Sequence, residues 1–168
     1  MEALGRLFDI VPAFTDGAVD LQTAQTGIRV NMEGVQGCTI VIVKGIGTAG
    51  DDPTYTLQEH TAYTGGTSAN LVEIDHWYIK SDTTAFDGAE TWTKTTQTAA
   101  ATATDATWAE TDTLIVIEVS AAALSDGYTH LSVNVGDVGS NAQLGAILYI
   151  LHGLNAQRAP ANLPQRLT

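Results

Sequence analysis

The strongest structural signal in the sequence is an apolar, β-branched run in its second half, Thr113-Leu114-Ile115-Val116-Ile117-Glu118-Val119. Runs of this composition and length are typical of β-strands. Its odd-numbered and even-numbered side chains are both mostly apolar, and the same holds for 145–150. Because alternate side chains point to opposite faces of a sheet, both segments are expected to be central strands that are covered on both sides.

Other segments show the same strand signals on either side of this run. They are 28–32, 39–44, 54–59, 71–80, 91–94, 130–135 and 144–151. About eight short strands separated by turns favour an all-β fold, an antiparallel β-sandwich or jelly-roll-like domain. Ser120, the three alanines after it and Gly127 predict one short helix. The Thr- and Ala-rich stretch 95–107 is expected to be a loop or a flat surface strand.

The domain organisation follows from length and from the two ends of the chain. A chain of 168 residues is long enough for one domain with its own core, and we expect that domain to span 15–152. Residues 1–14 and 153–168 contain three of the four prolines and scattered large apolar groups. Both ends are therefore expected to be extended terminal arms.

The two arms are the expected interaction segments. The net charge is -12, yet no acidic residue follows Asp137, so the C-terminal arm is weakly basic and carries scattered leucines, including Leu154. Such an arm suits a groove on a partner, and a disordered terminus is the alternative. The residues expected to contact a partner are Leu4, Leu7, Phe8, Phe14, Arg158, Leu163, Arg166 and Leu167.

Composition and charge argue against several classes of protein. The acidic balance of 19 carboxylates against 7 basic side chains argues against nucleic-acid binding, which needs clustered Lys and Arg. Cys38 has no partner for a disulfide and is expected to be a small buried hydrophobe. The N-terminus lacks the features of a signal peptide, and the apolar part of the uncharged C-terminal segment is too short for a bilayer. We expect synthesis in a cytoplasm and no membrane anchor.

No residue pattern indicates catalysis, a metal or a cofactor. The histidines show no HxH or HExxH spacing, and the serines lack a GxSxG elbow. The carboxylate pairs Asp51-Asp52 and Asp82 to Asp87 are explained as turn formers, with calcium as a minor alternative. The glycines of 45–50 resemble the start of GxGxxG but lead into Pro53, which favours a flexible hairpin loop. A non-enzymatic protein without a cofactor is expected.

The tryptophans leave two interpretations open. Buried, they would supply core or subunit contacts. Exposed on a β-sandwich, Trp77, Trp92 or Trp108 could stack on a sugar ring. The second interpretation gives an alternative function, a carbohydrate-binding β-sandwich module of a fibre or adhesin.

Residues 112–137 and 142–151 together resemble the capsid decoration (cement) proteins of tailed bacteriophages. Shared features are a strand, a short helical turn that ends in Asp-Gly, a further strand, and a last apolar strand ending near a glycine. Segments 16–20 and 39–44 resemble the front of the same pattern, so the likeness covers about 16–152 as a layout and not as an invariant motif. Members often carry basic residues in the strand after the Asp-Gly turn, and 130–135 has none.

The resemblance implies a structural virion protein. Such a protein would be made in the host cytoplasm, bind the major capsid protein on the outer capsid surface, bridge capsomers and resist the pressure of the packaged DNA. Cementing calls for a rigid body with a self-complementary contact. The implied assembly is a homotrimer, with a dimer as the alternative.

Overall fold

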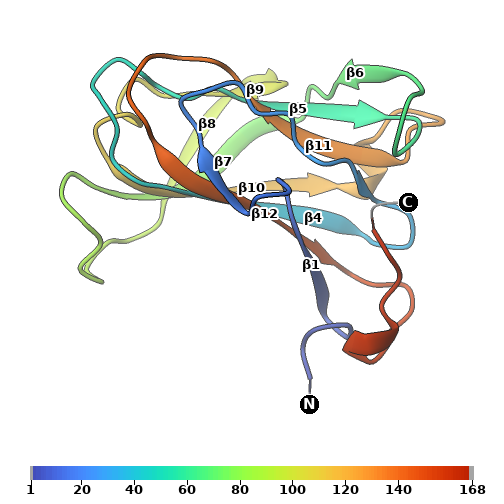
Figure 1. Cartoon of the computed structure of the whole chain (residues 1–168). Coiled ribbons are helices and arrows are strands. Elements are labelled where there is room, and N and C mark those ends of the chain that lie inside the picture. Colours follow the sequence, from blue (N-terminus) through green and yellow to red (C-terminus); the bar gives the residue numbers. More distant parts are fainter. Residues whose placement is uncertain (1, 167–168) are drawn as a thin grey trace.

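The computed structural model describes residues 2–166 and shows two antiparallel sheets packed face to face (Figure 1). The predicted all-β antiparallel sandwich is confirmed. The large sheet has the order β1 (Phe8–Pro12), β12 (Leu144–His152), β4 (Gly37–Lys44), β10 (Asp112–Ser120), β7 (Ile74–Asp82), β8 (Thr93–Ala100), and β2 (Ala18–Asp20) also pairs with β12. The small sheet has the order β3 (Val30–Asn31), β11 (His130–Val135), β5 (Tyr55–His60), β6 (Ser68–Asn70), and β9 (Thr102–Ala103) also pairs with β5.

The short helix predicted after Ser120 is present as a single 3-10 turn, η1 (Ala121–Ala123). The Ser120 hydroxyl accepts a hydrogen bond from the Ala122 amide at 3.2 Å, which is the expected N-cap. A second 3-10 turn, η2 (Pro160–Asn162), begins with the proline of the C-terminal segment. Within residues 2–166, no helix is long and apolar enough to cross a membrane.

The core lies between the sheets and is built from alternate residues of their strands. On β4 and β10, Ile40, Ile42, Ile115 and Ile117 are all at most 1% exposed. Burying each such side chain contributes roughly 1.5–3 kcal/mol. Tyr149 of β12 adds a polar link, because its hydroxyl accepts a hydrogen bond from the Val133 amide of β11 at 2.9 Å.

Cys38 is buried in this core, as expected. Burial raises the pKa of its thiol far above the ordinary value, because the thiolate would be desolvated. The thiol therefore stays protonated and acts as an apolar group.

The expectation that the two most apolar strands are covered on both sides is only half right. β10 lies between β4 and β7, and β12 lies between β4 and the edge strands, so both are central. Their odd-numbered side chains are buried, but Leu114, Val116, Leu148 and Ile150 on the other side are only half-buried. The small sheet covers one side of the large sheet, and no second layer formed by residues 2–166 covers the other.

Two other segments refine the sequence interpretation. Within the Thr- and Ala-rich stretch 95–107, residues 95–100 belong to the surface strand β8, 102–103 form β9 of the small sheet, and 104–107 are loop, so both predicted states occur. The glycine segment 45–50 is not a hairpin, because it carries the chain from the large sheet to β5 of the small sheet. It is also held in place, since the Gly47 amide donates to the Ala109 carbonyl at 2.7 Å.

The N-terminal residues 8–12 have the expected extended backbone, but they form strand β1 of the large sheet. β1 pairs with β12 from Phe8 opposite His152 to Pro12 opposite Leu148. The inward-facing Asp9 and Val11 are 7% and 8% exposed. The first arm is therefore partly integrated into the body.

Candidate functional site

The uncovered side of the large sheet is the most distinctive surface of the molecule. We call it the outer face and define it by the residues that the strand register places on this side. It includes Phe8, Ile10 and Pro12 of β1, Leu144, Ala146, Leu148, Ile150 and His152 of β12, Thr39, Val41 and Val43 of β4, Asp112, Leu114, Val116 and Glu118 of β10, His76, Tyr78, Lys80 and Asp82 of β7, Lys94 and Thr96 of β8, and Trp92 just before β8.

The centre of the outer face is apolar. One row of directly opposed residues crosses four strands and consists of Leu148, Val41, Val116 and Tyr78. Val43, in the next row, is 45% exposed. Contiguous apolar patches on folded domains are typical of interaction sites.

Two lysines border the apolar centre and lie over aromatic rings. The Lys80 ammonium is 5.0 Å from the centroid of the Trp92 ring. The Lys94 ammonium is 5.8 Å from the centroid of Tyr78. Each contact keeps a positive charge at the rim while its aliphatic stem adds to the apolar surface.

The outward side of the small sheet is the opposite in character. Its side chains bond to each other, as in the link from the Asn134 amide to the Gln58 carbonyl oxygen at 2.8 Å. Just beneath this surface, the buried His60 ring contacts the Ser68 hydroxyl at 2.7 Å and the Ser132 hydroxyl at 2.8 Å through its two nitrogens. A polar surface whose groups bond internally has little to gain from a partner, so the outer face is the better docking candidate.

His60 predicts how stability depends on pH. Burial, with a smaller contribution from the Arg29 charge, lowers the pKa of His60 to about 4. An unfolded chain binds the proton with a pKa near 6.5, so it gains protons before the folded state does. Stability is therefore full above pH 6.5 and falls toward pH 4, with a loss of about 2–3 kcal/mol by pH 4.5.

The measurement is chemical unfolding of His60→Gln and the unchanged protein at pH 7, 5.5 and 4.5. The free energy of unfolding of the variant should fall less on acidification by about that amount. His152→Gln, at a half-buried position of β12, serves as the control for the loss of one histidine. Parallel pH curves for His60→Gln and the unchanged protein would contradict the assignment.

The two ends of the chain meet beside the outer face. We call residues 2–7 and 153–166 the terminal lobe. The Arg158 amide donates to the Gly5 carbonyl at 2.8 Å, and the Asn31 amide donates to the Arg166 carbonyl at 2.8 Å. The Arg166 side chain adds an ion pair with Asp9 at 3.4 Å, with both side chains 10% exposed. The C-terminal segment is thus tied to the body.

One expected interaction residue must be reassigned. Phe14 is 4% exposed and belongs to the core, which corrects its assignment as a contact residue. The Arg166 side chain bonds to Asp9 and to the Glu33 carbonyl, and its contact with a partner stays a prediction. Leu167 lies outside the described residues.

The other expected residues keep surface positions on or beside the terminal lobe. Leu4 and Leu7 are 38% and 59% exposed. Phe8 and Leu163 are half-buried, and the side chain of Arg158 is exposed. These residues can contribute to a contact at the edge of the outer face.

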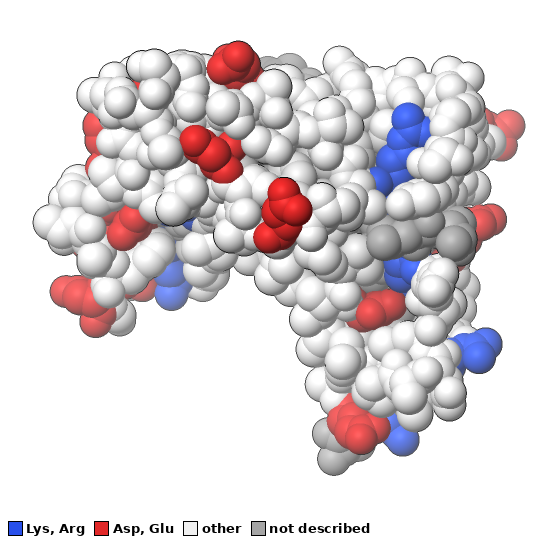
Figure 2. Space-filling view, viewed as in Figure 1, with Lys and Arg blue, Asp and Glu red and all other residues white. Residues whose placement is uncertain are grey.

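A long loop flanks the outer face on the other side. Residues 83–92 join β7 to β8 and project away from the small sheet, as the terminal lobe does at the opposite end (Figure 1). Figure 2 shows the outline hollowed between these two projections. Of the nine exposed large apolar residues among those described, seven lie on the outer face or in its two flanks. They are Leu4, Leu7, Ile10, Val43, Phe86, Trp92 and Leu144.

The outer face was missed as a site by the sequence analysis, although its signal was recognised. A strand that is apolar on both sides needs cover on both sides. The sequence does not say whether the chain itself or a partner supplies the second cover.

Two buried polar groups with reactive side chains, Ser132 and Lys44, are not accessible from the surface. The His60 and Ser132 pair resembles part of a nucleophilic dyad, but Ser132 is 1% exposed and cannot meet a substrate. Lys44 is also 1% exposed. Burial lowers the pKa of Lys44 to about 8 despite nearby Asp112, and its ammonium donates to the Gly45 and Thr111 carbonyls at 2.6 and 3.1 Å. Over residues 2–166, no group of three His, Cys, Asp or Glu residues could hold a metal.

The three tryptophans separate into two classes. Trp77 and Trp108 are 3% and 1% exposed and pack edge to face with their ring centroids 5.7 Å apart. The core interpretation is correct for these two. Trp92 is 48% exposed and lies on the outer face under Lys80, so no pair of exposed indoles forms a stacking platform.

Comparison with known proteins assigns no family. The chain matches no protein-family model and none of the curated proteins with which it was compared.

Proposed function

We propose that this chain is a non-enzymatic structural protein that attaches to a larger assembly through the outer face. The observation that carries the proposal is an apolar sheet face that is left uncovered between two projections. An apolar sheet face of this breadth costs free energy in water, and burial against a partner recovers it.

The size of the outer face supports a docking role. Six strands lie side by side in the large sheet, from β1 to β8. At ~4.8 Å between neighbouring strands they span roughly 25 Å. With strands of similar length the face is on the order of 600 Å². A standard interface buries about 800 Å² on each partner, so the terminal lobe and the 83–92 loop would supply the remainder.

The chemistry of the outer face constrains the partner surface. A partner should be apolar opposite Val41 and Val116 and should place carboxylates opposite Lys80 and Lys94. The net charge of -12 on the whole chain makes a strongly acidic partner unfavourable away from these two lysines.

We propose further that the assembly is a tailed-phage capsid and the partner its major capsid protein. The resemblance of 112–137 and 142–151 to capsid decoration proteins supports this choice. On this proposal the protein is a cement or decoration protein on the outside of the virion. It acts as a homotrimer, with a dimer as the alternative, and repeated copies gain avidity on a symmetric lattice.

Co-sedimentation of the purified chain with expanded phage heads that lack decoration tests this function. Saturable binding at a fixed number of copies per head, with a trimer in sedimentation analysis of the free protein, is the expected result. Heads that sediment without the chain at micromolar protein would overturn the capsid assignment. A glycan-array signal together with no binding to heads would favour the adhesin alternative.

A further inference from the structure

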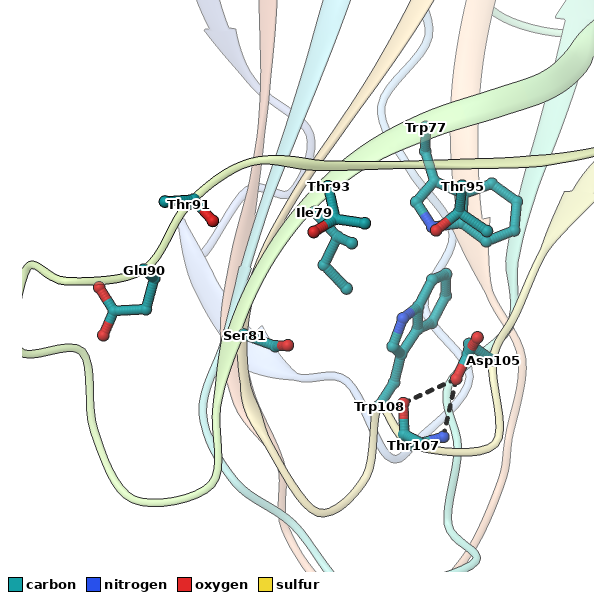
Figure 3. A pocket seen from close by; sticks show the side chains of 10 residues that line it. All are labelled: Trp77, Ile79, Ser81, Glu90, Thr91, Thr93, Thr95, Asp105, Thr107 and Trp108. Carbon is teal, nitrogen blue, oxygen red and sulfur yellow. Dashed lines mark hydrogen bonds between the residues drawn. The ribbon is translucent and has the colours of Figure 1, made fainter.

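A polar cavity lies on the side of β7 and β8 that is opposite to the outer face. It measures about 400 Å³, which is at the lower end of the range for small-ligand sites, roughly 300–1,000 Å³. Figure 3 shows β7 and β8 on one side of it, the 105–108 loop on another, and the 83–92 loop at one end. It is lined by Trp77, Ile79, Ser81, Glu90, Thr91, Thr93, Thr95, Asp105, Thr107 and Trp108.

An indole N–H in this cavity lacks a partner. Trp77 is 3% exposed, and its Nε1 is fully buried without a hydrogen-bond acceptor among the described residues. In Figure 3 the nitrogen-bearing edge of the ring is turned toward Thr95 and Trp108, into the cavity. Because this nitrogen is fully buried, a ligand oxygen cannot reach it, so the Trp77 indole contributes an apolar wall and the other lining residues supply the polar contacts.

Hydroxyl groups line the rest of the cavity. Ser81, Thr91, Thr93 and Thr95 line the cavity, and a hydroxyl can both donate and accept. The side chain of Asp105 uses Oδ1 to accept from the Thr107 amide and hydroxyl at 3.0 and 2.7 Å. Oδ2 of Asp105 remains as an acceptor for a ligand hydroxyl.

The charge of the lining excludes an anionic ligand. It contains two carboxylates, Glu90 and Asp105, and no Lys or Arg. Hydrogen bonds from the Asp87 and Gly88 amides lower the pKa of Glu90, so it stays negative at neutral pH. A phosphate or an acidic sugar would be repelled, whereas a neutral polyol would match the mixture of donors and acceptors.

We propose that this cavity binds one neutral sugar unit through the threonine hydroxyls of β8 and Asp105. The two indoles form part of the cavity wall, and no exposed stacking platform is needed. The site faces away from the outer face, so it does not depend on the proposed attachment function. A small polar ligand with a few such bonds is expected to bind at about millimolar affinity.

The test is a fluorescence titration in a Trp92→Phe background. This background leaves Trp77 and Trp108 as the remaining tryptophans of the three in the chain, and both line the cavity. The probes are glucose, galactose, mannose and N-acetylglucosamine, each as free sugar and as methyl glycoside. At least one neutral sugar should give a saturable change in tryptophan fluorescence at about millimolar concentration. Comparing each free sugar with its methyl glycoside shows whether the cavity takes a free sugar or the sugar residue of a glycan.

Two variants locate the binding. Thr95→Val removes a hydroxyl that lines the cavity and should weaken binding at least about fivefold, the effect of one lost hydrogen bond. Thr98→Val is the matched control, because Thr98 is an exposed threonine of β8 outside the cavity lining. Glucuronic acid should not bind. The proposal is overturned if no neutral sugar saturates the signal at tens of millimolar, or if Thr95→Val and Thr98→Val bind equally.

Discussion

The substitution Val43→Asp is expected to weaken attachment to capsids at least about 100-fold, equivalent to about 2.7 kcal/mol of binding free energy. Val43 lies opposite Ala146 on β12 and Leu114 on β10 at the centre of the outer face. A carboxylate there would be buried against an apolar partner without a counter-charge, which costs several kcal/mol. In the free protein the site is 45% exposed, so the free energy of unfolding should fall by only about 1 kcal/mol.

Val72→Asp is the matched control for this prediction. Val72 is 56% exposed and lies in the segment between β6 and β7, outside the outer face. The Val72→Asp variant should bind heads with the same affinity as the unchanged protein in a co-sedimentation titration. Full binding by Val43→Asp, or an equal loss in Val72→Asp, would show that the outer face is not the docking surface. Val43→Asp should also retain sugar binding, which separates the two proposals.

The body of the sandwich could be predicted because its signals are local. Strand β11 was predicted residue for residue, and β10 to within one residue at each end. Strand β1 was missed because Asp9 and Pro12 interrupt its apolar alternation. It becomes a strand through pairing with β12, and Asp9 can be buried because Arg166, 157 residues away, pairs with it. A contact of that sequence separation leaves no local pattern.

The candidate site was harder to predict than the fold for the same reason. Phe14 and Arg166 looked like exposed arm residues, and only the folded chain shows that one is core and the other is paired with Asp9. The apolar even-numbered residues of 113–119 were recognised but were assigned to a buried layer. The polar cavity depends on bringing Trp77, Thr95 and Asp105 together from three segments, and no spacing in the sequence specifies it.

The terminal lobe provides the largest expected effect on local stability, through Gly5→Ala. Gly5 has φ +79°, and a Cβ there would lie 2.4 Å from the Arg158 carbonyl oxygen. Because that oxygen belongs to the backbone, it cannot move aside without breaking the bond from the Arg158 amide to Gly5. The C-terminal segment should detach at a cost of roughly 3 kcal/mol, the sum of strain, clash and lost contacts. Hydrogen exchange at the Arg158 amide should accelerate about 100-fold.

Gly17→Ala separates the clash from the backbone strain. Gly17 has nearly the same conformation, φ +73°, but a Cβ there meets nothing within 4 Å. It should cost only about 1 kcal/mol, the strain of a left-handed alanine, and leave exchange at Arg158 unchanged. Equal effects of the two substitutions would mean that the lobe is not held by the contact between Gly5 and Arg158. If the contact does hold it, Gly5→Ala should also weaken capsid binding, but less than Val43→Asp, since the lobe only flanks the outer face.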